Sequence, residues 1–137
     1  MDYQETRTYL LNKPKAREDF PFGPDTAVFK IKGKMFATLM QKKDANTDQK
    51  ITQMNLKCDP EEAIMLRDVF DAVIPGYHMN KRWWNTVILD SSIPDGEIQR
   101  MIDNSYALVV KGLPKKERLP LELSYSPHEL YGLQNVG

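Results

Sequence analysis

The segment 74–90, IPGYHMNKRWWNTVILD, constrains the fold more than any other part of the chain. A Pro-Gly pair near its start favours a turn, and residues 84–89, which follow the turn, are rich in residues that prefer strands. Because successive side chains of a strand point to opposite faces, we expect one of Trp83 and Trp84 to be buried and the other exposed. Apolar residues continue on both faces, which indicates a central strand that is covered on both sides.

Residues 26–41 are predicted to form a β-hairpin. AVFKIK alternates, Gly33-Lys34 supplies the turn, and MFATLMQ returns. Residues 1–43 hold nine basic against five acidic side chains, and five lysines lie on this hairpin or just beyond it: Lys30, Lys32, Lys34, Lys42 and Lys43. Two interpretations stay open: the lysines protect an exposed strand edge from aggregation, or they form a wing that contacts phosphates.

Helix and strand signals divide the rest of the chain. Asp2 with Glu5 forms a capping-box pattern for a first helix, and Asp59-Pro60 opens another with a cap and a proline at the first position. The predicted elements are a helix at 2–12 with a short helical turn at 14–19, the hairpin, a strand at 50–58, a helix at 59–71, short strands at 73–79 and 84–89, and a helix at 95–111.

The elements follow the order α-β-β-β-α-β-β-α. Short connections within each group of strands make the pairs antiparallel, which predicts a two-layer α+β domain with helices on one face of an antiparallel sheet. The opposite face is then expected to be open, with Lys30, Lys32 and Trp83 pointing outward as a binding surface. Residues 1–113 form this domain, and residues 114–137 are expected to be an irregular C-terminal extension.

Composition restricts the classes of partner. Nineteen Lys and Arg residues balance nineteen Asp and Glu residues, so any attraction to nucleic acid must come from a local patch. The single cysteine, Cys58, forms no intrachain disulfide or multi-cysteine zinc site and suits a reducing cytoplasm. The chain has no apolar run near the ~20 residues of a membrane span, and its start resembles no signal peptide. We therefore expect a cytoplasmic protein without a membrane partner.

The segment 77–84 collects aromatic, cationic and amide side chains: Tyr77, His78, Asn80, Lys81, Arg82 and Trp83. Their rings can stack on bases, the two cations can contact phosphates, and the amide can read a base edge. The chain contains no Ser-His-Asp set, glycine-rich phosphate loop or pair of metal ligands at useful spacing. We therefore expect no catalytic residue, no metal and no cofactor.

Five strings in this order resemble the MmcQ/YjbR-like family: EDFPFG, VFKIKGKMFA, LKCDPEE, PGYHMNKRWWNTV and IDNSYALVVKGL. The resemblance covers about residues 1–113 and implies a fold similar to secretion-chaperone-like and frataxin-like domains. It also implies a double-wing DNA-binding motif, with wings around Gly33-Lys34 and around 77–84, and no established enzymatic activity. Many relatives have histidine where this chain has Trp83 and Asn104, so His78 lacks the partners that a metal or acid–base site would need.

The expected function is a non-enzymatic binding module that contacts DNA through two basic β-hairpin wings. The predicted site residues are Lys30, Lys32, Lys34, Tyr77, His78, Asn80, Lys81, Arg82 and Trp83. Two alternatives stay open. One is a protein-interaction or chaperone-like module that binds a protein partner or forms a homodimer. The other is a small-molecule binder or enzyme that uses His78 with Lys81 and Glu18.

Overall fold

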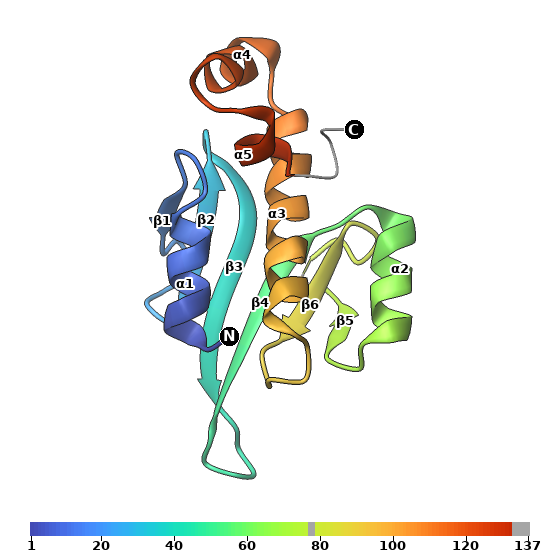
Figure 1. Cartoon of the computed structure of the whole chain (residues 1–137). Helices are drawn as coiled ribbons and strands as arrows, with labels where there is room; N and C mark the ends of the chain where they lie inside the picture. Colours follow the sequence, from blue (N-terminus) through green and yellow to red (C-terminus); the bar gives the residue numbers. More distant parts are fainter. Residues whose placement is uncertain (77–78, 133–137) are drawn as a thin grey trace.

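The computed structural model describes residues 1–76 and 79–132 and contains one six-stranded antiparallel sheet (Figure 1). The strand order is β1-β2-β3-β4-β6-β5. The strands are β1 (Arg17–Asp19), β2 (Thr26–Ile31), β3 (Lys34–Lys43), β4 (Lys50–Lys57), β5 (Val73–Pro75) and β6 (Trp84–Ile88). The predicted central strand is therefore present, because β6 lies between β4 and β5, and Asn85, Thr86 and Val87 are all buried.

The helices are α1 (Tyr3–Leu11), α2 (Pro60–Val69), α3 (Asp95–Lys111), α4 (Lys115–Ser124) and α5 (Pro127–Tyr131). In Figure 1, α1 and the long α3 lie in front of the sheet, α2 lies beside β5, and α4 and α5 lie at one end of α3. The predicted two-layer α+β class is confirmed. Among the helices of the described residues, none is long and apolar enough to cross a membrane.

Two predictions about local structure are wrong. Residues 17–19 form the edge strand β1 rather than a turn of helix, because their backbone pairs with β2. The extension 114–137, expected to be irregular, contains α4 and α5 within the part that the structure describes. Leu121 and Leu130 hold these helices in the core, and Ser126 with Glu129 forms a capping box that the sequence already carried.

A β-bulge shapes the middle of the sheet. Phe29 pairs with Ala37 but Lys30 pairs with Met35, so Phe36 is an extra residue on β3. The bulge lets the adjacent residues Phe36 and Ala37 both be fully buried in the core. The Phe36 ring packs edge-on against Tyr106 of α3, with ring centroids 5.2 Å apart.

Ser105 of α3 connects the helix layer to the sheet at this bulge. Its hydroxyl donates to the carbonyl of Phe36 at 2.6 Å and accepts from the backbone N–H of Lys57 at 2.9 Å. Ser105 is fully buried, so water cannot replace either hydrogen bond. One hydroxyl therefore satisfies backbone groups on both β3 and β4.

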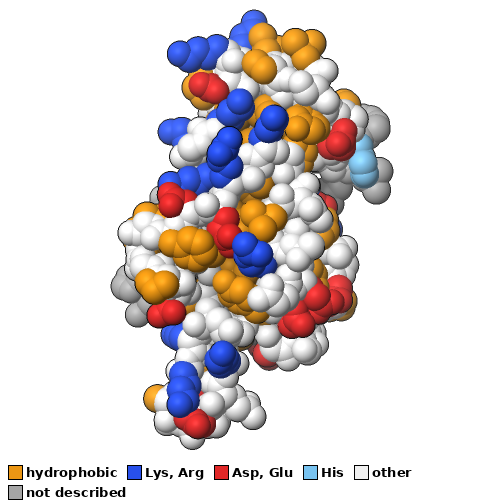
Figure 2. Space-filling view, turned by 90° about the vertical axis from the view of Figure 1, so that its left-hand side faces the viewer, with side chains coloured by type: hydrophobic (Ala, Val, Ile, Leu, Met, Phe, Trp, Pro, Cys, Tyr) orange, Lys and Arg blue, Asp and Glu red, His pale blue; other side chains and the backbone are white. Residues whose placement is uncertain are grey.

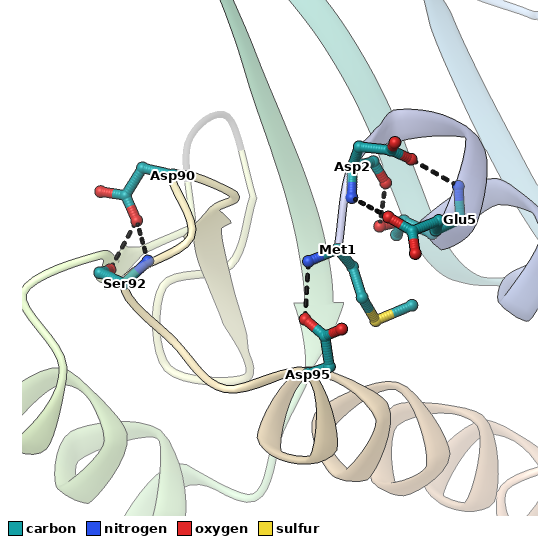
Figure 3. A network of polar contacts seen from close by, with 7 residues as sticks. Met1, Asp2, Glu5, Asp90, Ser92 and Asp95 are labelled. Carbon is teal, nitrogen blue, oxygen red and sulfur yellow. Dashed lines mark hydrogen bonds and ion pairs between the residues drawn. The ribbon is translucent and has the colours of Figure 1, made fainter.

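The first helix is fixed to α3 by polar contacts (Figure 3). Asp2 accepts from the N–H of Glu5 at 2.8 Å, the Glu5 carboxylate accepts from the N–H of Asp2, and this completes the predicted capping box. The Met1 amino group lies 2.7 Å from Asp95 at the start of α3. Farther along α1, Tyr9 donates to Asp103 of α3 at 2.8 Å.

Ser105→Ala is expected to lower the free energy of unfolding by about 2–4 kcal/mol, because a buried carbonyl and a buried N–H both lose their partner. Chemical denaturation monitored by circular dichroism measures this change. Ser124→Ala, at an exposed site on α4, is the matched control and should change stability by less than about 0.5 kcal/mol. Equal stabilities of the two variants would contradict the role given to Ser105.

Candidate nucleic-acid interface

The two predicted wings lie at the same end of the sheet. Ile31 at the end of β2 pairs with Lys34 at the start of β3, which places the first turn there. Lys57 at the end of β4 pairs with Trp84 at the start of β6, so the β5–β6 connection lies at that end too. We call the side chains gathered here the sheet-end surface: Lys30, Lys32, Lys34, Lys57, Lys81, Arg82 and Trp83.

The first turn is a tight two-residue loop. Lys32 and Gly33 have positive φ of 51° and 79°, as a two-residue hairpin with right-handed strand twist requires. Lys32 and Lys34 are exposed at this tip. Lys30 is half-buried and lies 3.1 Å from Asp19, and its hydrogen bond is the main cause of the lowered pKa of that carboxyl. Lys30 is therefore already neutralised, whereas the lysines at the tip are not.

Backbone and side-chain contacts hold the second turn in place. Asn80 accepts from the backbone N–H of Arg82 at 3.0 Å through Oδ1, which leaves its NH₂ group as a donor. The Lys81 ammonium donates to the carbonyl of Gly76 at 3.2 Å, and Arg67 of α2 donates to the carbonyl of Lys81. The predicted site residues Tyr77 and His78 lie outside the described residues.

Trp83 is the more exposed of the two tryptophans, with 37% of its surface accessible, whereas Trp84 is half-buried. The Lys57 ammonium lies 5.7 Å from the centre of the Trp83 ring, a cation–π contact. The sequence prediction missed Lys57 as a site residue. Strand alternation was the available signal, because it places Lys57 opposite buried Leu56 and therefore away from the helices.

The sheet-end surface has a local excess of positive charge. Within residues 1–76 and 79–132, no ion pair involves five of its cations: Lys32, Lys34, Lys57, Lys81 and Arg82. Figure 2, which faces the β1 edge, shows Lys and Arg side chains gathered in its upper half, the part of the molecule that in Figure 1 holds the β2–β3 turn together with α4 and α5. The whole chain has zero net charge, but this end of the sheet is basic.

The structure separates two members of the alternative site, Glu18 and Lys81, and the third, His78, lies outside the described residues. Glu18 lies on the edge strand β1 and forms a bidentate ion pair with Arg7 of α1, at 2.8 and 2.6 Å. Strands β2, β3 and β4 separate it from β6, a span of about 19 Å at the usual strand spacing. Among the described residues, no group of three or more His, Cys, Asp and Glu side chains could hold a metal ion.

Cys58 is buried, as its position at a strand end indicates, and should be chemically inert. Burial is the main factor that raises the pKa of its thiol to about 12, and Glu62 and Asp59 raise it further. Iodoacetamide should therefore modify the native protein at about pH 8 at least ~100-fold more slowly than the same chain in denaturant, because the reactive thiolate is rare. Mass spectrometry measures both rates. Similar rates would show that the thiol is accessible and ionised.

Gly76 is required where the second turn meets β6. A Cβ at this position would lie 2.8 Å from the carbonyl oxygen of Trp84 and 2.9 Å from its Cβ. Gly76→Ala should therefore cost about 1–3 kcal/mol of stability and alter tryptophan fluorescence, because backbone must move to make room. Gly96→Ala is the control: its Cβ meets nothing within 4 Å, and alanine favours the helix. If the Gly76→Ala variant were as stable as the parent protein, the close approach of Gly76 to Trp84 would be contradicted.

Known proteins resemble this chain in both sequence and structure. Uncharacterized protein YbdF of Escherichia coli O157:H7 is 31% identical over 116 residues, covering 85% of this chain and 90% of that protein. Uncharacterized protein YjbR of Escherichia coli strain K12 is 31% identical over 118 residues, covering 86% and 95%.

Two solved structures share the fold. Deinococcus radiodurans protein DR2400, assigned to domain family DUF419, matches with a TM-score of 0.73 and 35% identity over 86% of each chain. A Pseudomonas syringae protein matches with a TM-score of 0.69 and 34% identity, over 79% of this chain and 98% of that one. The model of the YjbR family matches residues 11–108, and the chain therefore belongs to the YjbR family.

Proposed function

We propose that the protein binds DNA through the sheet-end surface, with the β2–β3 turn and the β5–β6 connection as two wings. The observation that carries this proposal is that both turns lie at one end of the sheet and bring to it cations that form no ion pair within the described residues. The second wing also carries the exposed Trp83 ring, which lies beside the Lys57 ammonium. Cations next to an exposed aromatic ring are suited to phosphates and to stacked bases.

The spacing of the wings suits a nucleic-acid backbone. Only β4 lies between the β2–β3 hairpin and β6, so the two tips are separated by roughly 10–15 Å at ordinary strand spacing. The major groove of B-form DNA is about 12 Å wide. Lysines of the first tip and the cations of the second can therefore contact phosphates on the two sides of one groove.

The side chains divide into two roles. Lys32, Lys34, Lys81 and Arg82 contact phosphates, which positions the protein without selecting a sequence. Trp83 stacks on an exposed base or inserts at a base step. The Oδ1 of Asn80 already accepts from the Arg82 N–H, which orients the side chain and leaves its NH₂ donors free for base acceptors.

Binding is expected to be weak and sensitive to salt. Five cations without an ion pair in the described part of the chain release at most about five counterions, so log K against log salt should fall with a slope no steeper than about −4.5 on duplex DNA. Fluorescence polarisation with a labelled ~20-base-pair duplex, and with the matching single strand, measures this slope between about 25 and 200 mM salt. Quenching of tryptophan fluorescence reports the contact with Trp83 in the same titration.

Charge reversal at the first tip tests the position of the site. Lys32→Glu with Lys34→Glu should weaken binding at least tenfold and reduce the slope by about 2. The control is Lys42→Glu with Lys50→Glu, since these lysines lie at the opposite end of the sheet and form no ion pair within the described residues. Equal losses in the two variants, or no binding of either DNA at the lowest salt, would refute the proposal.

A further inference from the structure

Helix α2 exposes apolar side chains where a helix of a monomer would carry polar ones. Met65 is 63% exposed and Val69 is 70% exposed, and Ile64 beside them is 55% exposed. The opposite side of the helix meets the core through Ala63 and Leu66. Large apolar groups that share one helix face outside the core mark a contact surface.

Acidic side chains border this apolar stripe. Glu61 and Glu62 lie in the first turn of α2, and Glu97 of α3 lies on the far side of a shallow groove that Met65 and Val69 also line. The one cation that lines this groove among the described residues is Arg100, and it is already paired with Glu62 at 2.8 Å and with Glu97 at 3.1 Å. The surface therefore suits a partner that is apolar and basic.

Helix α4 has that complementary chemistry. Leu119 is 43% exposed and Leu123 is 88% exposed, while Leu121 on the other side of the helix is buried. Lys115 and Lys116 are exposed in its first turn. No ion pair involves these two lysines within residues 1–76 and 79–132.

The two helices carry their complementary residues at the same spacing. Glu61, Glu62, Met65 and Val69 of α2 match Lys115, Lys116, Leu119 and Leu123 of α4, position for position. A parallel alignment of the helices would bring Lys115 to Glu61 and Lys116 to Glu62, which also pairs with Arg100, and each leucine to an apolar partner. An antiparallel alignment would instead place the lysines beside Val69.

We propose that α4 of one copy docks along α2 of a second copy, in the parallel alignment. Figure 1 shows α2 and α4 at separate parts of the molecule, so the contact forms between copies rather than within one. Because the two surfaces differ, the interface is head-to-tail, and each copy offers one free α2 and one free α4. Each helix has ten residues and is about 15 Å long, so the interface is small and the association weak.

Sedimentation velocity from about 10 µM to 1 mM protein tests this proposal at concentrations suited to a weak interface. The parent protein should sediment faster as its concentration rises. Val69→Asp and Leu123→Asp should each weaken self-association at least tenfold, because a carboxylate replaces an apolar contact. Phe22→Asp is the matched control: Phe22 is 74% exposed elsewhere on the molecule, so its variant should associate like the parent. Circular dichroism checks that every variant is folded.

Mixing the two variants gives the decisive measurement. The Val69→Asp protein keeps an intact α4, and the Leu123→Asp protein keeps an intact α2, so an equimolar mixture should form a one-to-one dimer although each variant alone is monomeric. Charge reversal gives an independent test. Glu61→Lys and Lys115→Glu should each weaken self-association, and an equimolar mixture of these two variants should restore it. A parent protein that stays monomeric at 1 mM, or a mixture that stays monomeric, would overturn the proposal.

These measurements are separate from the DNA-binding experiment. Val69 and Leu123 lie outside the sheet-end surface, so their variants should bind a labelled duplex with unchanged affinity per copy. Loss of self-association with retained DNA binding supports both proposals. If the Lys32→Glu, Lys34→Glu variant loses DNA binding but self-associates normally, both proposals are also supported, because neither interaction depends on the other.

Discussion

The hydroxyl of Ser105 is the contact on which the arrangement of the two layers depends. It bonds β3 and β4 at once, at the place where the bulge directs Phe36 and Ala37 into the core. With this backbone position fixed, Phe36 meets Tyr106 and the Lys57 side chain projects from the opposite face toward Trp83. The contact of Lys57 with Trp83, one part of the sheet-end surface, is thus connected with the way α3 is attached to the sheet.

Local signals in the sequence predicted the elements that depend on neighbours in the chain. The caps at Asp2 and Asp59, the hairpin turn at Gly33 and the two-sided strand after Trp83 all follow from short-range chemistry, and the structure has each of them. The bulge, the edge strand β1 and the contact of Lys57 with Trp83 depend on residues that are distant in sequence. Alternation can give the face of the strand on which Lys57 lies, but it does not give its partner until the register of the strands is known.

The extension shows a different limit. Its two helices were missed although Ser126 and Glu129 form a capping pattern. Pro127 lies in the first turn of α5, where proline is compatible with a helix. Pro120 lies inside α4, which nevertheless forms, with the neighbouring Leu121 buried in the core. The site itself could be predicted only as a set of residue types, since no local rule states that two turns meet at one end of a sheet.

Both edge strands of the sheet are only three residues long, and this limits how copies can assemble. β1 offers few free backbone groups, and β5 ends at Pro75, which has no N–H to donate. Neither of these short edge strands is therefore a long template on which a foreign strand could extend the sheet. The contact proposed between α4 and α2 uses helix side chains instead, and single substitutions there can strengthen or weaken it without changing the sheet.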